Sequence, residues 1–135
     1  MRFIDTNVLL YAVSTAREER EKTVRARAIL DARDLALSVQ VLQEFYVQAT
    51  RKSKAKRLTH EQAAALIESW LRFRVEDVSV ARLQSALSTR LRWGISYWDA
   101  AIVEAARAAR CATLVSEDLQ DGMDFGGVRV ENPFR

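Results

Sequence analysis

The sequence predicts an α/β domain built around a mostly parallel sheet of about five strands. Short apolar runs alternate along the chain with longer segments of helical periodicity, which is the pattern expected of β–α units. The chain has 135 residues, of which 49% are hydrophobic and 29% charged, with only four glycines and one proline. This composition is globular, and we expect residues 1–135 to form a single domain.

Five short apolar segments are the predicted strands. The first segment ends at Asp5, and Asp118 lies two residues past the fourth. The predicted strands comprise residues 2–5, 35–38, 75–78, 112–116 and 128–130.

Capping signals and periodicity place the helices. Ser79 and Ser96 precede helical runs as N-cap residues, and Thr59-His60-Glu61-Gln62 has the form of a capping box. In the first long helical pattern, Val24, Ala28 and Ile29 are expected on the apolar side. The predicted helices comprise residues 18–33, 39–50, 59–72, 79–94 and 97–109.

The net charge of +3 is unevenly distributed along the chain. The stretch Arg51-Lys52-Ser53-Lys54-Ala55-Lys56-Arg57 contains five cations and no acid. A run like this is usually a solvated loop. Beside a carboxylate site it would suit a polyanionic substrate, because cations near phosphates supply sequence-independent affinity. Arg51, Lys52 and Lys54 are therefore candidates for substrate contact.

The sequence carries no signal for a membrane or for export. No apolar run approaches the roughly 20 residues of a membrane span. The N-terminus lacks the apolar stretch of a signal peptide. The single cysteine, Cys111, excludes an internal disulfide framework and fits a reducing compartment. We expect a cytoplasmic protein with no membrane partner.

Four acids lie inside or just after apolar segments, where an isolated carboxylate is costly to bury. Asp5 follows Phe3-Ile4, Glu44 lies in VLQEFYV, Asp99 in SYWDAAIV, and Asp118 comes after ATLVS. Ligands of parallel sheets bind outside the carboxyl ends of the strands, so Asp5 and Asp118 are expected at one edge. The four acids suggest a site built from carboxylates.

Two of these acids could instead cap helices. Asp before a helical run is a favoured N-cap, and for Asp5 this role is compatible with one in a site. Ser96-Tyr97-Trp98-Asp99 fits a capping box, in which Asp99 would bond the backbone of the cap. Asp99 also lies in line with Ile102 on the apolar stripe, whereas Glu104 belongs to the polar face. Both interpretations of Asp99 stay open.

The other two acids also have simpler interpretations. Glu44 could be a solvated residue at the border of an apolar helix face. Asp118 could serve turn chemistry near a glycine. Glu117 and Asp121 lie in the same loop and compete with Asp118 for any role, although its place after the strand favours Asp118.

Four segments together resemble a known family. They are FIDTNVLLYA at residues 3–12, VLQEFYV at 41–47, SYWDAAIVEAA at 96–106 and TLVSEDLQDG at 113–122. In this order they resemble the PIN-domain ribonucleases, and more narrowly the VapC toxins of type II toxin–antitoxin systems. The resemblance implies a PIN-like three-layer domain, with helices on both faces of the sheet and a metal site at its carboxyl edge.

The resemblance also implies roles for individual residues. The family's catalytic acidic quartet matches Asp5, Glu44, Asp99 and Asp118. The polar residues beside the first acid match Thr6 and Asn7, and the small hydroxyl residue two before the last acid matches Ser116.

An all-carboxylate site selects a hard cation, so Mg²⁺ or Mn²⁺ is the expected cofactor. Zinc and histidine-dependent chemistry are disfavoured because the chain has one cysteine and one histidine, and His60 is expected on the surface. We expect Asp5 and Asp99 to be the main metal ligands and Asp118 to bind directly or through water. Glu44 would hold a second ion or orient the attacking water.

These features predict a metal-dependent endoribonuclease that acts as a toxin. The metal would orient a water and help deprotonate it for in-line attack on an RNA phosphodiester. Tyr97 and Trp98 are further candidates for substrate contact, with Trp98 expected in the core or in an interface. VapC-like toxins typically form homodimers and are silenced by an antitoxin whose tail covers the acidic site, often with an inserted arginine. Both partners are therefore expected here.

Three alternatives were weighed against the toxin. A housekeeping RNA-processing or DNA-directed nuclease would share the fold and the acids, but the compact domain favours the toxin. A catalytically silent nucleic-acid-binding domain is disfavoured because all four acids are present. Phosphatases of the haloacid type need a second Asp where this chain has Asn7, and the acidic pair and lysine of response-regulator receivers are missing as well.

Overall fold

The computed structural model describes all 135 residues and contains one sheet of five parallel strands. The strands lie in the order β3-β2-β1-β4-β5, so the first strand occupies the centre. Both the number of strands and the parallel sheet agree with the sequence prediction. The strands are β1 (Arg2–Ile4), β2 (Leu35–Ser38), β3 (Arg74–Glu76), β4 (Thr113–Val115) and β5 (Arg129–Glu131).

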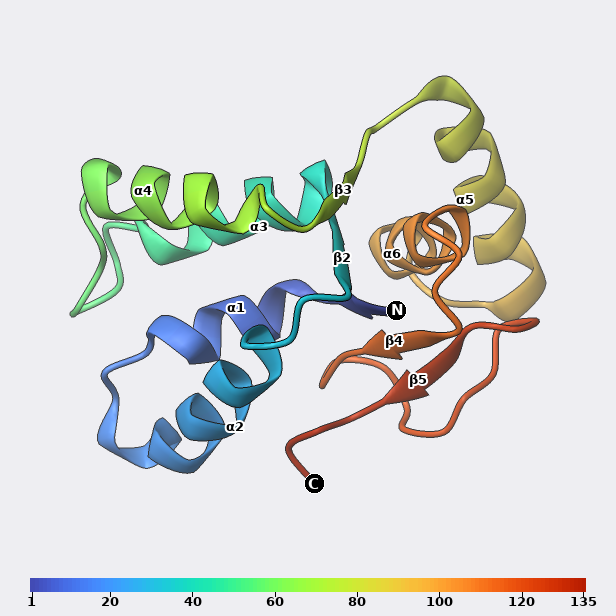
Figure 1. Ribbon diagram of the computed structural model, residues 1–135. Coiled ribbons are helices and arrows are strands. Elements are labelled where there is room, and N and C mark those ends of the chain that lie inside the picture. The colour runs from blue at the N-terminus through green and yellow to red at the C-terminus, as the bar shows by residue number, and fades with distance from the viewer.

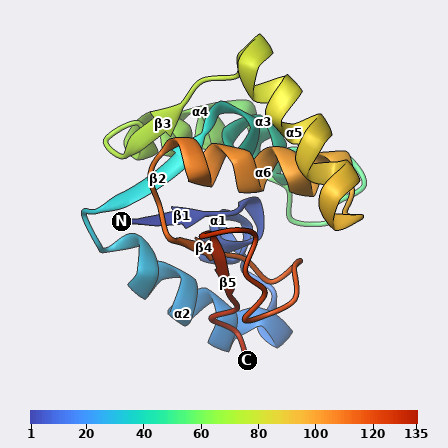
Figure 2. The same cartoon turned by 90° about the vertical axis from the view of Figure 1, so that its right-hand side faces the viewer.

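Helices cover the sheet on both sides, which confirms the predicted three-layer arrangement. Helices α5 (Val80–Trp93) and α6 (Tyr97–Ala108) lie on one face, and the other four helices lie on the opposite face (Figure 1). Viewed from the side, β1, β4 and β5 run between α6 and α2 (Figure 2). The four are α1 (Thr6–Val13), α2 (Arg20–Leu30, preceded by a 3₁₀ turn at Arg17–Glu19), α3 (Val39–Ala49) and α4 (His60–Trp70).

The predicted caps form as expected. The Thr59 hydroxyl accepts from the Gln62 N–H while the Gln62 side chain accepts from the Thr59 N–H, so the capping box is complete. Ser79 and Ser96 each accept a hydrogen bond from the third residue of the helix that follows. Gly94 ends α5 with φ of 67°, a left-handed conformation that glycine adopts without steric cost.

The apolar side predicted for the helix over 18–33 was wrong. Val24 is 66% exposed and Ala28 is exposed as well, whereas Thr23 and Ala26 are buried together with the predicted Ile29. The helix begins only after the 3₁₀ turn, and Thr23 donates its hydroxyl proton to the Tyr11 carbonyl oxygen at 2.7 Å. This contact docks α2 on α1 through the Thr23 side and leaves Val24 in solvent.

The polar face predicted for α6 was also partly wrong. Glu104 is 7% exposed, because α5 packs directly over that side of α6. Its carboxylate accepts from the Thr89 hydroxyl at 2.7 Å and from Arg107 Nε at 3.2 Å. A buried carboxylate held by two donors ties α5 to α6 without leaving an unpaired charge.

The main core places the ends of the central strands. Phe3 and Ile4 of β1, together with Leu114 and Val115 of β4, are completely buried in one hydrophobic cluster. Burying these residues fixes the level at which both strands stop, and polar residues follow immediately at the same edge.

No helix is long and apolar enough to cross a membrane.

Candidate active site

The pairing of β1 with β4 brings two polar residues side by side. Ile4 lies opposite Val115, and the Asp5 N–H donates to the Val115 carbonyl oxygen at 3.0 Å. The next residue of each strand, Asp5 and Ser116, therefore emerges at the carboxyl edge of the sheet. Ser116, which is fully buried, donates its hydroxyl proton to Asp5 Oδ2 at 2.7 Å. Residues 111 positions apart in sequence thus form the floor of a site.

Asp5 is at once the N-cap of α1 and a buried carboxylate. Its Oδ1 accepts from the Thr6 N–H at 2.7 Å, so the cap interpretation is confirmed. Only 5% of the residue is exposed. Burial raises the pKa of Asp5 to about 7; bonds from Ser116 and Thr6 oppose this shift, and the charges of Asp118 and Glu44 add to it.

Helix α3 brings Glu44 to the same place. Ser38, at the end of β2, caps α3 by accepting from the Val41 N–H, and this directs the first turns of the helix over the sheet edge. Glu44 Oε2 accepts from the Thr6 hydroxyl at 2.9 Å, and Oε1 accepts from Gln40 Nε2 at 2.9 Å. Glu44 is therefore held toward the site and is not a freely solvated residue.

Asn7 connects the first turn of α1 to the loop after β4. Its Nδ2 donates to Asp118 Oδ2 at 3.2 Å and lies 3.4 Å from the Ser116 hydroxyl oxygen. Its Oδ1 accepts from the Glu117 N–H at 3.3 Å. The Asp118 N–H in turn donates to Ser116 Oγ at 3.1 Å, so Asn7 and Ser116 together fix the exposed Asp118 beside Asp5.

The two competitors of Asp118 are engaged elsewhere. Glu117 accepts from Lys22 Nζ at 2.6 Å and from the Tyr11 hydroxyl. Burial raises the pKa of Glu117, but the bonds from Lys22 and Tyr11 outweigh it and hold the pKa below its usual range. Asp121 accepts from the Asn132 N–H at 2.7 Å and from Arg135 at 3.0 Å, close to the C-terminus.

Asp99 forms only half of the expected capping box. Its N–H donates to the Ser96 hydroxyl oxygen at 3.1 Å, but the Ser96 N–H makes no reciprocal bond to the Asp99 carboxylate. Burial raises the pKa of Asp99, a bond with Ser96 lowers it, and the charges of Asp118 and Glu44 raise it further. Asp99 therefore lies within electrostatic range of Asp118 and Glu44.

The carboxylate oxygens are ligands suited to a hard divalent cation, but they do not yet form a coordination site. The charges of Glu44 and Asp118 act on both Asp5 and Asp99, and this repulsion between carboxylates from separate segments favours the uptake of positive charge. No three of the acidic, histidine or cysteine side chains already stand in a geometry that could hold an ion. Holding an ion would require Asp99, Asp118 and Glu44 to reorient, and these three are only partly buried or exposed.

The predicted substrate contacts lie in different places. Lys54 lines a cavity of about 380 Å³ together with Glu44 and Asp118, whereas Arg51 and Lys52 do not line it. Trp98 is 63% exposed, so of the two places expected for it the core is excluded and an interface stays a prediction. Gln40, which sequence reasoning missed, donates to Glu44; its only signal is the four-residue spacing on one helix face.

Comparison with protein families identifies the chain. The profile of the PIN domain family matches residues 2–120. The chain belongs to the PIN domain family, as the four sequence segments predicted. A search of curated proteins finds no significant match.

Solved structures share the fold at low sequence identity. The toxin–antitoxin complex from Klebsiella pneumoniae is similar with a TM-score of 0.69 and 20% identity, covering 99% of this chain and 98% of that one. FitAB bound to a DNA fragment has a TM-score of 0.74 and 21% identity, covering 100% and 96%. VapC20 of Mycobacterium tuberculosis, a toxin that cleaves the sarcin–ricin loop, has a TM-score of 0.66 and 18% identity, covering 84% and 87%. At identities this low, the structural similarity establishes a shared fold and nothing more.

Proposed function

We propose that this PIN-domain protein is a Mg²⁺- or Mn²⁺-dependent endoribonuclease and the cytoplasmic toxin of a toxin–antitoxin pair. One observation carries the catalytic part. The buried carboxylate of Asp5, fixed by Ser116 and Thr6, stands in electrostatic contact with Glu44 and Asp118 at the carboxyl edge of the sheet. Such a cluster of like charges is costly unless it serves to hold a cation.

The four acids divide the work in this proposal. Asp5 and Asp99 would be the main metal ligands, with Asp118 positioned by Asn7 to bind directly or through water. A bound divalent ion would supply Lewis acidity toward a phosphoryl oxygen and lower the pKa of a water. Glu44, whose two oxygens accept from Thr6 and Gln40, would orient the attacking water or share a second ion.

The toxin role is supported by the proteins of known structure that share this fold. The chain spans nearly the whole length of toxin–antitoxin proteins of known structure, including complexes with DNA from Rickettsia felis and Salmonella typhimurium. An antitoxin tail that inserts an arginine between Asp99 and Asp118 would neutralise the same charges that attract a metal. Cognate antitoxin and RNA are the partners that this site would accept.

A homodimer is the second assembly that we propose. Helix α5 presents an apolar face to solvent, with exposed fractions between 45% and 82%. Exposed apolar stripes of this length on a helix mark interaction surfaces. The residues are Val80, Leu83, Leu87 and Leu91.

The experiment measures cleavage of a panel of structured and single-stranded RNAs, with DNA of the same sequences as a second arm. Wild type should cut RNA with Mg²⁺ or Mn²⁺ and stop in EDTA. Asp5→Asn and Asp99→Asn should lose at least about 10²-fold in rate. Asp121→Asn is the matched control, since Asp121 is bound outside the site. Full activity of the Asp5 and Asp99 variants would sink the assignment, and cleavage of DNA alone would point to a DNA-directed nuclease.

A further inference from the structure

Two cavities adjoin beside the carboxylate cluster. The first, of about 380 Å³, contains Glu44 and Asp118. The second, of about 450 Å³, lies between the loop after α1 and the basic loop 51–57. Leu10, Glu19 and Lys54 line both cavities, so the second continues directly from the first.

Lys54 is the only cation that lines the acidic cavity. Its ammonium group forms no salt bridge, whereas Lys22, which does not line the cavity, pairs with Glu117, one of the lining acids. The loop carrying Lys54 is anchored, because the Leu58 N–H donates to the Ala49 carbonyl oxygen at 2.8 Å and the Lys54 N–H donates to Arg51. An unpaired cation in the same cavity as Glu44 and Asp118 is available to an anionic ligand.

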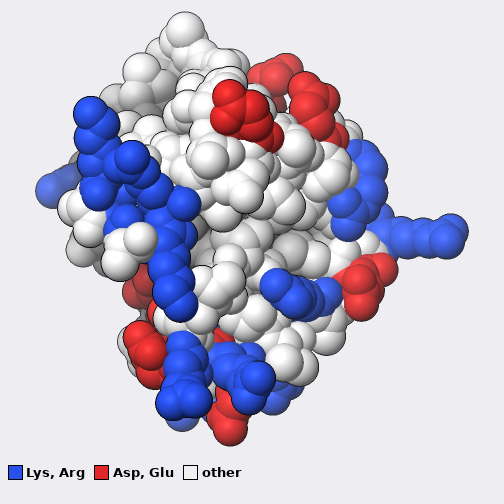
Figure 3. All heavy atoms as spheres, turned by 90° about the vertical axis from the view of Figure 1, so that its left-hand side faces the viewer, with Lys and Arg blue, Asp and Glu red and all other residues white.

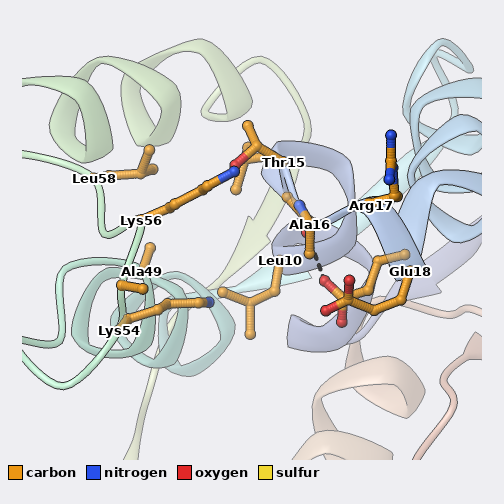
Figure 4. Close-up of a pocket in the computed structure, with 13 residues that line it drawn as sticks. Leu10, Thr15, Ala16, Arg17, Glu18, Ala49, Lys54, Lys56 and Leu58 are labelled. Carbon is orange, nitrogen blue, oxygen red and sulfur yellow. Dashed lines mark hydrogen bonds between the residues drawn. The ribbon is translucent and has the colours of Figure 1, made fainter.

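The second cavity is a groove with charged walls and an apolar floor. Lys54 and Lys56 extend from the basic loop toward the facing segment with Thr15 and Arg17 (Figure 4). This side of the molecule shows a band of Lys and Arg side chains (Figure 3). Two acids share the groove, Glu18 and Glu19, and Glu19 already accepts a hydrogen bond from the Ser14 hydroxyl. The floor is formed by Leu10, Val13, Ala49 and Leu58.

We infer that this groove holds the RNA segment adjacent to the scissile phosphate, an inference that rests on the proposed function. Lys54 contacts the phosphate nearest the cut, and Lys56 and Arg17 contact the phosphates that follow. The apolar floor receives a base, which loses contact with water there. The groove binds RNA because it opens into the carboxylate cavity and because its unpaired cation sits at the junction.

The basic loop contains a second lysine that serves as a control for substitution of Lys54. Lys52 is an exposed lysine two residues from Lys54, but it lines neither cavity. Lys54→Gln and Lys52→Gln remove the same charge from the same loop, and neither side chain is buried, so both variants should fold. A general electrostatic effect would lower the RNA affinity of both variants equally. Binding in the groove would lower the affinity of Lys54→Gln alone.

The test measures fluorescence anisotropy of a fluorescein-labelled single-stranded RNA of about 12 nucleotides, with Ca²⁺ replacing Mg²⁺ to slow cleavage. Lys54→Gln should weaken binding about 3- to 10-fold and reduce the slope of log K against log salt by about 0.7. Lys52→Gln should change binding less than about twofold. Crosslinks from 4-thiouridine in the same RNA should map to residues 10–17 and 54–58.

The outcomes separate the groove from the reaction. Equal losses of affinity in the two variants, or no loss in Lys54→Gln, would overturn the proposal that the groove binds RNA. If Lys54→Gln loses no affinity, a segment of a partner protein becomes the better candidate for the groove. Selective loss in Lys54→Gln with crosslinks in the groove supports the inference. If that selective loss appears while wild type cleaves no RNA with any metal, the proposed nuclease fails and the RNA-binding groove stands.

Discussion

The Ser116 hydroxyl donates a 2.7 Å hydrogen bond to Asp5 Oδ2, joining the ends of two neighbouring parallel strands. The same hydroxyl oxygen accepts from the Asp118 N–H at 3.1 Å. One buried side chain therefore sets the orientation of the first acid and the position of the last. The site depends on Ser116 although this residue carries no charge.

Replacing Ser116 with alanine should impair the site without unfolding the protein. The variant loses a hydrogen bond that lowers the pKa of Asp5, so the pKa should rise further and the pH–rate profile should shift toward higher pH. We expect kcat to fall about tenfold at neutral pH, as for the loss of a group that positions a metal ligand. An unchanged pH profile with lower kcat would contradict the linkage between Ser116 and the Asp5 charge.

Asp5 should make the metal-free protein less stable as pH rises. The folded protein holds the Asp5 proton up to a pKa of about 7, whereas the unfolded chain releases it near 3.8. The free energy of unfolding therefore falls as the pH rises from 3.8 to about 7. The total fall is about 4 kcal/mol and is complete above pH 7. Asp5→Asn removes the buried charge, so its Tm advantage over wild type should widen from pH 4 to pH 7 and then level off.

Thermal scans in EDTA over this pH range check that prediction. Added Mg²⁺ should raise the Tm of wild type more at pH 8 than at pH 5.5, because protons compete with the ion for Asp5. Asp121→Asn should follow wild type throughout. A Tm advantage of Asp5→Asn that is constant with pH would mean that Asp5 ionises normally.

The neighbours Glu117 and Asp118 should respond differently to loss of charge. Asp118→Asn should reduce cleavage at least about tenfold and weaken metal binding in calorimetry, since Asp118 faces the site. Glu117→Gln should keep cleavage within about twofold and lower the Tm modestly, because it disrupts the partly exposed bonds to Lys22 and Tyr11. The reverse pattern would make Glu117 the ligand.

Leu87→Glu should convert the proposed dimer into a monomer. Leu87 is 52% exposed at the middle of the apolar face of α5, and a buried unpaired carboxylate would oppose association. Light scattering after size-exclusion chromatography measures the mass. Val24→Glu is the control, because Val24 is also exposed but lies on α2, across the sheet. A monomeric wild type, or a variant that stays dimeric, would rule out this interface.

The sequence predicted those features that depend on local signals. Asp5 and Asp118 could be placed at one edge because Asp5 ends an apolar run, Asp118 follows another by two residues, and parallel strands end at the same edge of a sheet. Caps at Thr59, Ser79 and Ser96 were correct because their hydrogen bonds span only three residues.

The remainder depended on packing between elements, which has no local signal. Glu104 appears polar in any helical projection, and only the docking of α5 buries it. The place of Asp118 after the strand favoured it in the sequence, but the ion pair that engages Glu117 with Lys22, a residue of a distant helix, has no local signal. Likewise, nothing in the basic run distinguishes Lys54 from Lys52 until the loop folds against α1.

The four acids occur at positions 5, 44, 99 and 118, so they leave the ribosome at widely separated times. Asp5 is synthesised 111 residues before its hydroxyl donor Ser116, and its backbone partner Val115 is likewise synthesised long after it. A nascent or prematurely terminated chain lacking β4 cannot assemble the carboxylate cluster. Interrupted translation is therefore expected to yield fragments without the assembled site, so the proposed nuclease activity would arise only in chains synthesised past β4.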